Sequence, residues 1–154
     1  MNILFVTSTR IGDAILSTGL LEYLRSQNSS ANITIACGPV AAPLFNGLPG
    51  LKEIIVLDKM LLSLHWLRLW VLTISTKWDI IIDLRNAPVT LFLRNRSRFT
   101  LPKAENNKHK VEQISNVLNL PTAVQPRIWT QKYHDNLAKE LLSGEEKILA
   151  IGPT

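Results

Sequence analysis

Residues 1–28 of the chain read MNILFVTSTRIGDAILSTGLLEYLRSQN, and this stretch decides the fold. Its apolar run from Ile3 to Val6 has the length of a strand and ends at a polar turn. Apolar residues then recur near helical spacing from Asp13 to Gln27, until Asn28-Ser29-Ser30 breaks the pattern. A strand followed directly by a helix is the first unit of a parallel α/β sheet. No basic segment precedes the run and no small-residue cleavage site follows it, so we interpret it as a strand and not as a signal peptide.

The same alternation continues along the chain. Strand-length apolar runs are found at Ile3–Val6, Ile33–Ala36, Glu53–Leu57, Ile80–Asp83 and Ile148–Ile151. Between them we predict helices at 13–27, 61–76, 87–95, 108–119 and 132–142, with a short one at 40–45. Because the runs are nearly continuous in Ile, Val and Leu, the strands should be covered on both faces. We therefore predict a Rossmann-like α/β domain over residues 1–146, with a parallel sheet and helices on both faces.

Composition sets limits on this domain and on its partners. With 154 residues and 46% hydrophobic residues, the chain can form one domain with a real core. The single cysteine, Cys37, excludes an internal disulfide and fits a reducing compartment, so we expect a cytoplasmic protein. A net charge of +5 and an isoelectric point near 9.6 favour contact with anionic surfaces, without distinguishing phosphorylated lipid from nucleic acid.

The turn Thr7–Asp13 is the first candidate site, because ligands bind at the carboxyl ends of strands in an open parallel sheet. Gly12 permits close approach of a ligand, and free N–H groups at a helix start can hold an anion. The turn contains neither G-x-G-x-x-G nor G-x-x-x-x-G-K-[ST], which excludes the usual dinucleotide fingerprint and the P-loop. Asp13 has two interpretations at this stage: a cap or dipole partner of the helix, or a catalytic carboxylate.

Four passages in order resemble glycosyltransferase family 9, the ADP-heptose:lipopolysaccharide heptosyltransferases. The first is the Ser/Thr-rich turn with Ile11-Gly12-Asp13 and the following helix that carries Ser17-Thr18. Residues 46–55 are similar to the family's N-P-G-V-D-E-V-I passage, and residues 78–85 are similar to its Y-D-hydrophobic-D-L strand. Residues 108–111 together with 118–121 are similar to its H-x-V…L-L-x-L-G passage. This chain departs from the family at Gly19, where proline is common, and at Asn86 and Asn119, where glycine is common.

The resemblance implies the first, acceptor-side half of a two-domain GT-B enzyme, with 147–154 as the first strand of the nucleotide-sugar half. It implies inverting transfer of a heptose-type sugar from a nucleotide-sugar such as ADP-heptose to a lipopolysaccharide core acceptor. Asp13 would be the general base that takes the proton of the acceptor hydroxyl, while the acceptor would bind along Ser8, Thr9, Arg10 and Gly12. No cofactor, metal or nucleic acid is implied, and the scattered His65, His109 and His134 support no metal site. The isolated half is expected to be inactive and to self-associate through the surface left uncovered.

Two further features concern the acceptor. Arg85 and Asn86 follow a predicted strand and are well placed for the cleft. Arg94, Arg96 and Arg98, together with Lys103, Lys108 and Lys110, are either a solvated basic face or a receptor for acceptor phosphates.

The predicted helix at 61–76 is too short to span a bilayer, which takes about 20 apolar residues. It is either a core helix or a contact through Trp66 and Trp70, which lie one turn apart, with the surface of the inner membrane or with a partner. Two other functions stay open: a non-catalytic binding or scaffold module, and a small Rossmann-like nucleotide-binding protein.

Overall fold

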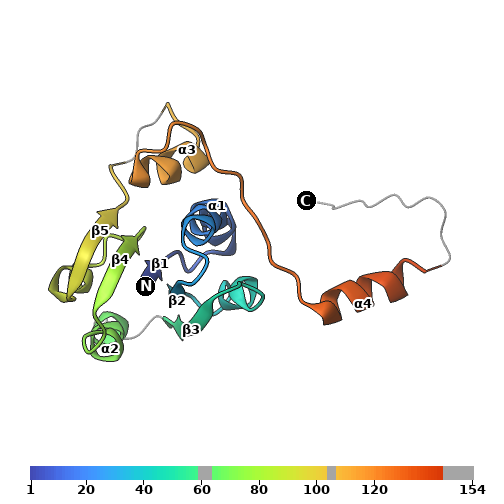
Figure 1. The fold of residues 1–154 in the computed structure, drawn as a ribbon, viewed down its shortest axis with the longest axis horizontal. Helices are drawn as coiled ribbons and strands as arrows, with labels where there is room; N and C mark the ends of the chain where they lie inside the picture. The colour runs from blue at the N-terminus through green and yellow to red at the C-terminus, as the bar shows by residue number, and fades with distance from the viewer. Residues whose placement is uncertain (59–63, 104–106, 144–154) are drawn as a thin grey trace.

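A computed structural model describes residues 1–58, 64–103 and 107–143. It contains a five-stranded parallel sheet in the order β3-β2-β1-β4-β5 (Figure 1). The strands are β1 (Asn2–Val6), β2 (Asn32–Cys37), β3 (Leu51–Val56), β4 (Trp78–Asp83) and β5 (Asn95–Thr100). This confirms the predicted Rossmann-like α/β class. The strand predicted at Ile148–Ile151, and with it the second unit at 147–154, lies outside the described residues.

Helices cover both faces of the sheet, as predicted. On one face lie α1 (Ile11–Gln27), α3 (Lys110–Ser115) and the short 3-10 helix η1 (Ala42–Phe45). On the other lie α2 (Leu64–Thr73) and the 3-10 helix η3 (Pro88–Phe92). After α3, the 3-10 helix η4 (Asn116–Leu118) completes the helix that was predicted at 108–119.

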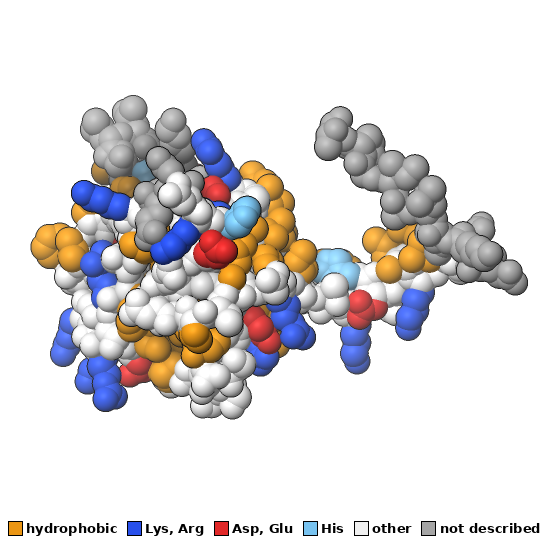
Figure 2. Space-filling model, turned by 90° about the horizontal axis from the view of Figure 1, so that it is seen from above, with side chains coloured by type: hydrophobic (Ala, Val, Ile, Leu, Met, Phe, Trp, Pro, Cys, Tyr) orange, Lys and Arg blue, Asp and Glu red, His pale blue; other side chains and the backbone are white. Residues whose placement is uncertain are grey.

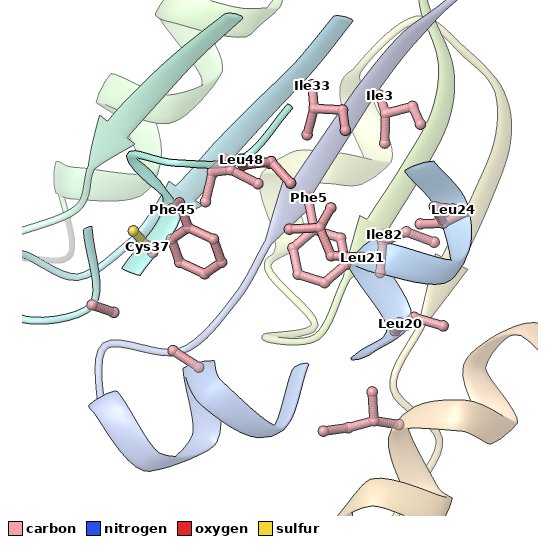
Figure 3. Close-up of a cluster of buried hydrophobic side chains, with 14 of the residues drawn as sticks. Ile3, Phe5, Leu20, Leu21, Leu24, Ile33, Cys37, Phe45, Leu48 and Ile82 are labelled. Atoms are coloured by element: carbon pink, nitrogen blue, oxygen red, sulfur yellow. The ribbon is translucent and has the colours of Figure 1, made fainter. Parts of the chain in front are cut away.

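Strand β1 shows why both faces must be apolar. Ile3 and Phe5 pack toward α1 in the cluster of Figure 3, whereas Leu4 and Val6 belong to the cluster under α2. All four side chains are fully buried. Successive strand residues point to opposite faces, so a strand with helices on both sides needs an unbroken apolar run.

One predicted element is wrong. Residues 87–95 do not form an α-helix: η3 occupies Pro88–Phe92, and the chain then enters β5, which the sequence did not reveal. In β5 the polar Arg96 and Arg98 alternate with Ser97 and the partly buried Phe99, and only Phe99 packs in the α1-side core. β5 is at an edge of the sheet and pairs on one side only, a position that tolerates charged side chains, so β5 can form without the apolar run that marks β1, β2 and β4.

The two tryptophans of α2 belong to the core. Trp66 and Trp70 are partly buried and pack against the cluster that contains Leu69 and Ile81. This supports the core-helix interpretation and contradicts the view that these rings face a lipid surface.

A network around Glu22 ties the segment that follows η4 back onto α1. Arg25 donates two hydrogen bonds of 2.7 Å to the Glu22 carboxylate, and Trp129 Nε1 donates a third at 3.2 Å. Together with Arg127, these donors hold the pKa of Glu22 below its usual range, the hydrogen bond from Arg25 contributing most. The indole of Trp129 is thereby buried against the α1-side core.

Beyond this segment, α4 (Lys132–Leu141) matches the helix that was predicted at 132–142 and extends away from the sheet (Figure 1). No residue of α4 is buried, and Tyr133, Leu137 and Leu141 are more than half exposed. These three residues repeat at a spacing of four, so they share one side of the helix. Self-association of the chain stays a prediction.

Alanine substitutions at Gly19 and Gly12, both in α1, test how closely the chain packs against each glycine. A Cβ at Gly19 would lie 2.5 Å from the carbonyl oxygen of Gln125, whereas one at Gly12 would meet nothing within 4 Å. Alanine normally stabilises a helix relative to glycine. We therefore expect Gly19→Ala to lower the free energy of unfolding by about 1–3 kcal/mol and Gly12→Ala to leave it unchanged or raise it. Urea denaturation measures both, and a stabilised Gly19→Ala would show that the 124–130 segment does not rest on α1.

The buried thiol of Cys37 makes the free energy of unfolding depend on pH in the alkaline range. Burial raises the pKa of its thiol from 9.0 to about 12. Between these values the unfolded chain loses the proton first, so the free energy of unfolding should fall by about 1.4 kcal/mol per pH unit as pH rises. Below pH 9 this contribution is fully present. In Cys37→Ala the decline between pH 8.5 and 10 should be smaller by about that amount. Equal declines in both proteins would contradict the assignment.

Candidate functional site

The sheet order creates a crevice between β1 and β4. The chain leaves β1 into α1, on one face, while α2 on the opposite face precedes β4. After β4 the chain enters η3, on the same face as α2, so the segments that follow the adjacent strands β1 and β4 separate toward opposite faces. This is the topological switch point at which open α/β sheets bind ligands.

A cavity of about 370 Å³ occupies this crevice. It is lined by Thr7, Ser8, Thr9, Arg10, Asp13, Leu84, Arg85, Leu101, Lys110 and Ile114. Five predicted site residues are thus brought together: Ser8, Thr9, Arg10, Asp13 and Arg85. Among the lining side chains, the three cations Arg10, Arg85 and Lys110 outnumber the single carboxylate, so the cavity favours an anionic ligand.

The hydrogen bonds of the turn orient Asp13 without capping the helix. Ser8 Oγ accepts from the backbone N–H of Arg10 at 3.0 Å and donates to Asp13 Oδ2 at 3.4 Å. Arg10 is the N-cap residue, and α1 has no side-chain cap hydrogen bond. The capping interpretation of Asp13 is therefore not supported by a hydrogen bond, although its charge still complements the helix dipole. The partly exposed carboxylate is left accessible from the cavity.

Arg85 lies between this cavity and a second one. Its Nη1 donates to Thr9 Oγ1 at 3.3 Å, and its guanidinium carbon lies 5.7 Å from the ring centroid of Trp66, within cation–π range. Beyond it, a cavity of about 600 Å³ is lined by Thr9, Pro39, Val40, Leu57, Asp58, His65, Trp66 and Arg85.

The turn that carries Arg85 is fixed by a fully buried carboxylate at the end of β4. Asp83 Oδ1 accepts from the backbone N–H of Arg85 at 3.0 Å. Its Oδ2 accepts from Thr90 Oγ1 at 2.7 Å and pairs with Arg98 Nη2 at 3.5 Å. Arg98 Nε also donates to Thr90 Oγ1 at 2.9 Å. Arg98 is thus the partner of a buried charge, a role that its position in the sequence did not suggest.

The basic cluster predicted from the sequence is divided in the structure. Of its six members only Lys110 lines the cavity at the switch point. Arg94 and Arg96 are exposed on the segment that enters β5, outside the described cavity. Whether Arg94, Arg96 and Arg98 contact an acceptor stays a prediction.

The backbone conformation explains why asparagine is accepted at the two positions where glycine is common in the family. Asn86 and Asn119 have φ of 51° and 52°, in the left-handed region that glycine favours and asparagine tolerates better than most residues. Asn86 Nδ2 also donates to the carbonyl of Leu101 at 3.0 Å, which ties the loop after β4 to the end of β5. Asn86 therefore supports the loop that presents Arg85.

Sequence reasoning did not single out three residues of the cavity lining, Leu84, Leu101 and Ile114, whereas it named Lys110 as a member of the basic cluster. A signal existed for Leu84, which directly follows the predicted strand at 80–83. Leu101 follows β5, which was not predicted, and Lys110 and Ile114 come from α3, which only the tertiary packing against α1 brings to the crevice.

The described residues contain neither a cluster of metal ligands nor a membrane-spanning helix. Within 1–58, 64–103 and 107–143, no group of three or more His, Cys, Asp or Glu residues could hold a metal ion. Independence from metal stays a prediction. In the same part of the chain, no helix is long and apolar enough to cross a membrane.

No protein-family model and no curated protein matches this sequence, but solved structures do. A family 9 glycosyl transferase from Veillonella parvula superposes with a TM-score of 0.66 at 20% identity, covering 96% of this chain and 50% of its own. The chain has the fold of half a family 9 glycosyltransferase. The E. coli heptosyltransferase WaaC with ADP matches with a TM-score of 0.60 at 12% identity, over 83% of this chain and 50% of its own. WaaC with ADP-2-deoxy-2-fluoro heptose gives 0.53 at 12% identity, over 94% and 55%. The resemblance inferred from the four sequence passages is confirmed at the level of the fold, and the chain spans about half the length of these structures.

Arg98 should matter for stability and its neighbours should not. Arg98→Ser leaves the buried Asp83 carboxylate without its cation, so we expect the free energy of unfolding to fall by about 1–3 kcal/mol. Arg96→Ser removes an exposed charge and is the matched control, with little expected effect. Chemical denaturation distinguishes them, and equal stability of the two variants would show that Asp83 does not depend on Arg98.

Proposed function

We propose that this chain is the acceptor-binding half of an inverting, metal-independent GT-B glycosyltransferase. In this proposal it transfers a heptose-type sugar from a nucleotide-sugar to a lipopolysaccharide core acceptor, on the cytoplasmic side of the membrane. The observation that carries the proposal is the partly exposed Asp13 carboxylate, which lines a cationic cavity at the switch point of the sheet.

Asp13 would act as the general base. The acceptor hydroxyl attacks the anomeric carbon of the nucleotide-sugar, its proton passes to Asp13, and the bond to the diphosphate breaks as the new glycosidic bond forms. The nucleoside diphosphate leaves with the electron pair of the broken bond. Ser8, which donates to Asp13 Oδ2, holds one carboxylate oxygen in place, so the other can receive the proton.

The cations of the cavity suit an anionic acceptor. Arg85 presents a planar fork of donors, which fits the paired oxygens of phosphates and sugar carboxylates. Its backbone is fixed by Asp83 and its side chain by Thr9 and Trp66, so little entropy is lost when it binds. Lys110 adds a second cation from α3, on the opposite side of the sheet from Trp66.

The donor would be bound by the half of the enzyme that these 154 residues do not contain. Two matched structures are named as complexes with ADP or an ADP-heptose analogue, and this chain covers 50% and 55% of their length. At Gly12, a Cβ would meet no atom within 4 Å, so the start of α1 faces open space. A reacting sugar held from the other half could approach the backbone there.

Asp13→Asn in a protein that contains both halves tests the base directly. Asparagine keeps the size of the side chain but does not accept the proton, so turnover should fall roughly a hundredfold or more. The melting temperature should change little, because Asp13 makes no capping hydrogen bond and the interaction of its charge with the helix dipole contributes only about 0.3–1 kcal/mol. Glu53→Gln, an exposed carboxylate on β3, is the control and should keep normal turnover. An Asp13→Asn enzyme with near-normal turnover would overturn the proposed mechanism.

A further inference from the structure

Helix α2 is apolar on its outer side as well as its inner side. Leu69 and Thr73 are buried against the sheet, with Trp66 and Trp70 packed beside them. On the opposite side, Leu64, Leu67, Val71 and Leu72 are 45%, 53%, 59% and 46% exposed. Arg68 is the only charged residue of α2, and a helix that is hydrophobic on nearly every side is normally covered on every side. The outer side of α2 therefore has the composition of a contact surface.

The 3-10 helix η3 extends this surface. It contacts α2 on the same face of the sheet, where its Val89 packs in the cluster under α2. Its Leu91 and Phe92 are 62% and 71% exposed. We call Leu64, Leu67, Val71, Leu72, Leu91 and Phe92 the α2–η3 surface. Exposed large hydrophobics gathered on two adjacent elements indicate an interaction site, whereas scattered ones do not.

The exposed charged side chains on α2 and β5 are all positive. The segments 59–78 and 84–103, which contain α2, η3 and β5, include no acidic residue. Arg68 is exposed on the outer side of α2, and Arg94 and Arg96 are exposed directly after η3. Two acidic residues lie between these segments: Asp83 is buried and paired with Arg98, and Asp79 accepts a hydrogen bond of 2.7 Å from the backbone N–H of Asn2. Figure 2 shows hydrophobic side chains projecting at the end of the molecule where β5 lies, with Lys and Arg side chains beside them.

We propose that the α2–η3 surface binds the anionic surface of a phospholipid bilayer. Exposed Leu, Val and Phe side chains enter the boundary between headgroups and acyl chains, while Arg68, Arg94 and Arg96 pair with lipid phosphates. The chain lies on the bilayer and does not span it. A protein partner would require acidic groups to match the arginines, whereas an anionic bilayer supplies negative charge and an apolar layer together. The inference rests on this surface alone and does not depend on the proposed reaction.

The position of the α2–η3 surface determines which edge of the sheet lies next to a bound bilayer. The first turn of α2 contributes His65 and Trp66 to the second cavity, which shares Thr9 and Arg85 with the cavity at the switch point. The surface therefore begins beside the crevice at the carboxyl ends of the strands. A bilayer that binds α2 and η3 brings lipid headgroups to this edge of the sheet.

Vesicle co-sedimentation of the 154-residue chain tests the proposal. Vesicles of phosphatidylglycerol and phosphatidylethanolamine should bind the chain, and vesicles of phosphatidylcholine alone should bind it at least tenfold more weakly. The double variant Leu67→Glu/Val71→Glu places charges on exposed positions only and should lower binding to anionic vesicles tenfold or more. Leu137→Glu/Leu141→Glu on α4 is the matched control, with the same change at similarly exposed leucines, and should bind as the parent does.

A third variant separates the contribution of charge. Arg94→Glu/Arg96→Glu should weaken binding to anionic vesicles and make that binding less sensitive to salt concentration. The weak binding to neutral vesicles should be unchanged. Circular dichroism checks that each variant is folded. The proposal is overturned if the α2 variant binds anionic vesicles as the parent does, or if the α4 variant loses binding equally. It is also overturned if the parent ignores vesicles and forms a dimer that Leu67→Glu/Val71→Glu disrupts, because the surface then binds a second copy.

Discussion

The central position of β1 is the constraint on which the rest of the structure depends. β1 forms hydrogen bonds with β2 on one side and β4 on the other, and both of its faces are covered. Its two neighbours are reached by connections over opposite faces, through α1 and through α2. The crevice beside Thr7 and Arg85 is the place where these connections separate. The location of the candidate site thus follows from strand order and needs no special loop structure.

Burial on both faces also explains which parts of the fold could be predicted from the sequence. β1, β2 and β4 are inner strands, and their continuous apolar runs made them recognisable. β5 is an edge strand whose outer positions carry arginines, so its only local signal was the alternation of Arg96 and Arg98 with Ser97 and Phe99. The arginines were instead interpreted as a basic cluster, either a solvated face or a receptor for acceptor phosphates. Asn86, which precedes η3, was recognised as a departure from glycine, but its left-handed backbone became visible only in the structure.

Side-chain direction was harder to predict than secondary structure. Residue spacing placed Trp66 and Trp70 on one side of α2, but every side of this helix is apolar, so spacing does not say which side meets the sheet. The sheet accommodates the tryptophans and leaves the smaller Leu67 and Val71 outside. Likewise, Arg96 and Arg98 look equivalent in sequence, yet only Arg98 has a buried carboxylate within reach. Such distinctions depend on neighbours that are distant along the chain.

Asp13 gives the crevice a character that differs from a nucleotide-binding Rossmann site. In such a site, the free N–H groups and the positive dipole end of the first helix receive a phosphate. Here the third residue of α1 is a carboxylate, whose charge offsets the roughly half positive charge of the helix end. A diphosphate at the same N–H groups would meet the negative charge of Asp13, whereas a neutral hydroxyl would find a proton acceptor. Of the three cations that line the cavity, Arg10 lies directly before α1, whereas Arg85 follows β4 and Lys110 belongs to α3. Under the proposed function, this half therefore activates the attacking hydroxyl and holds anionic groups of the acceptor, and the departing diphosphate has to be stabilised by the other half of the enzyme.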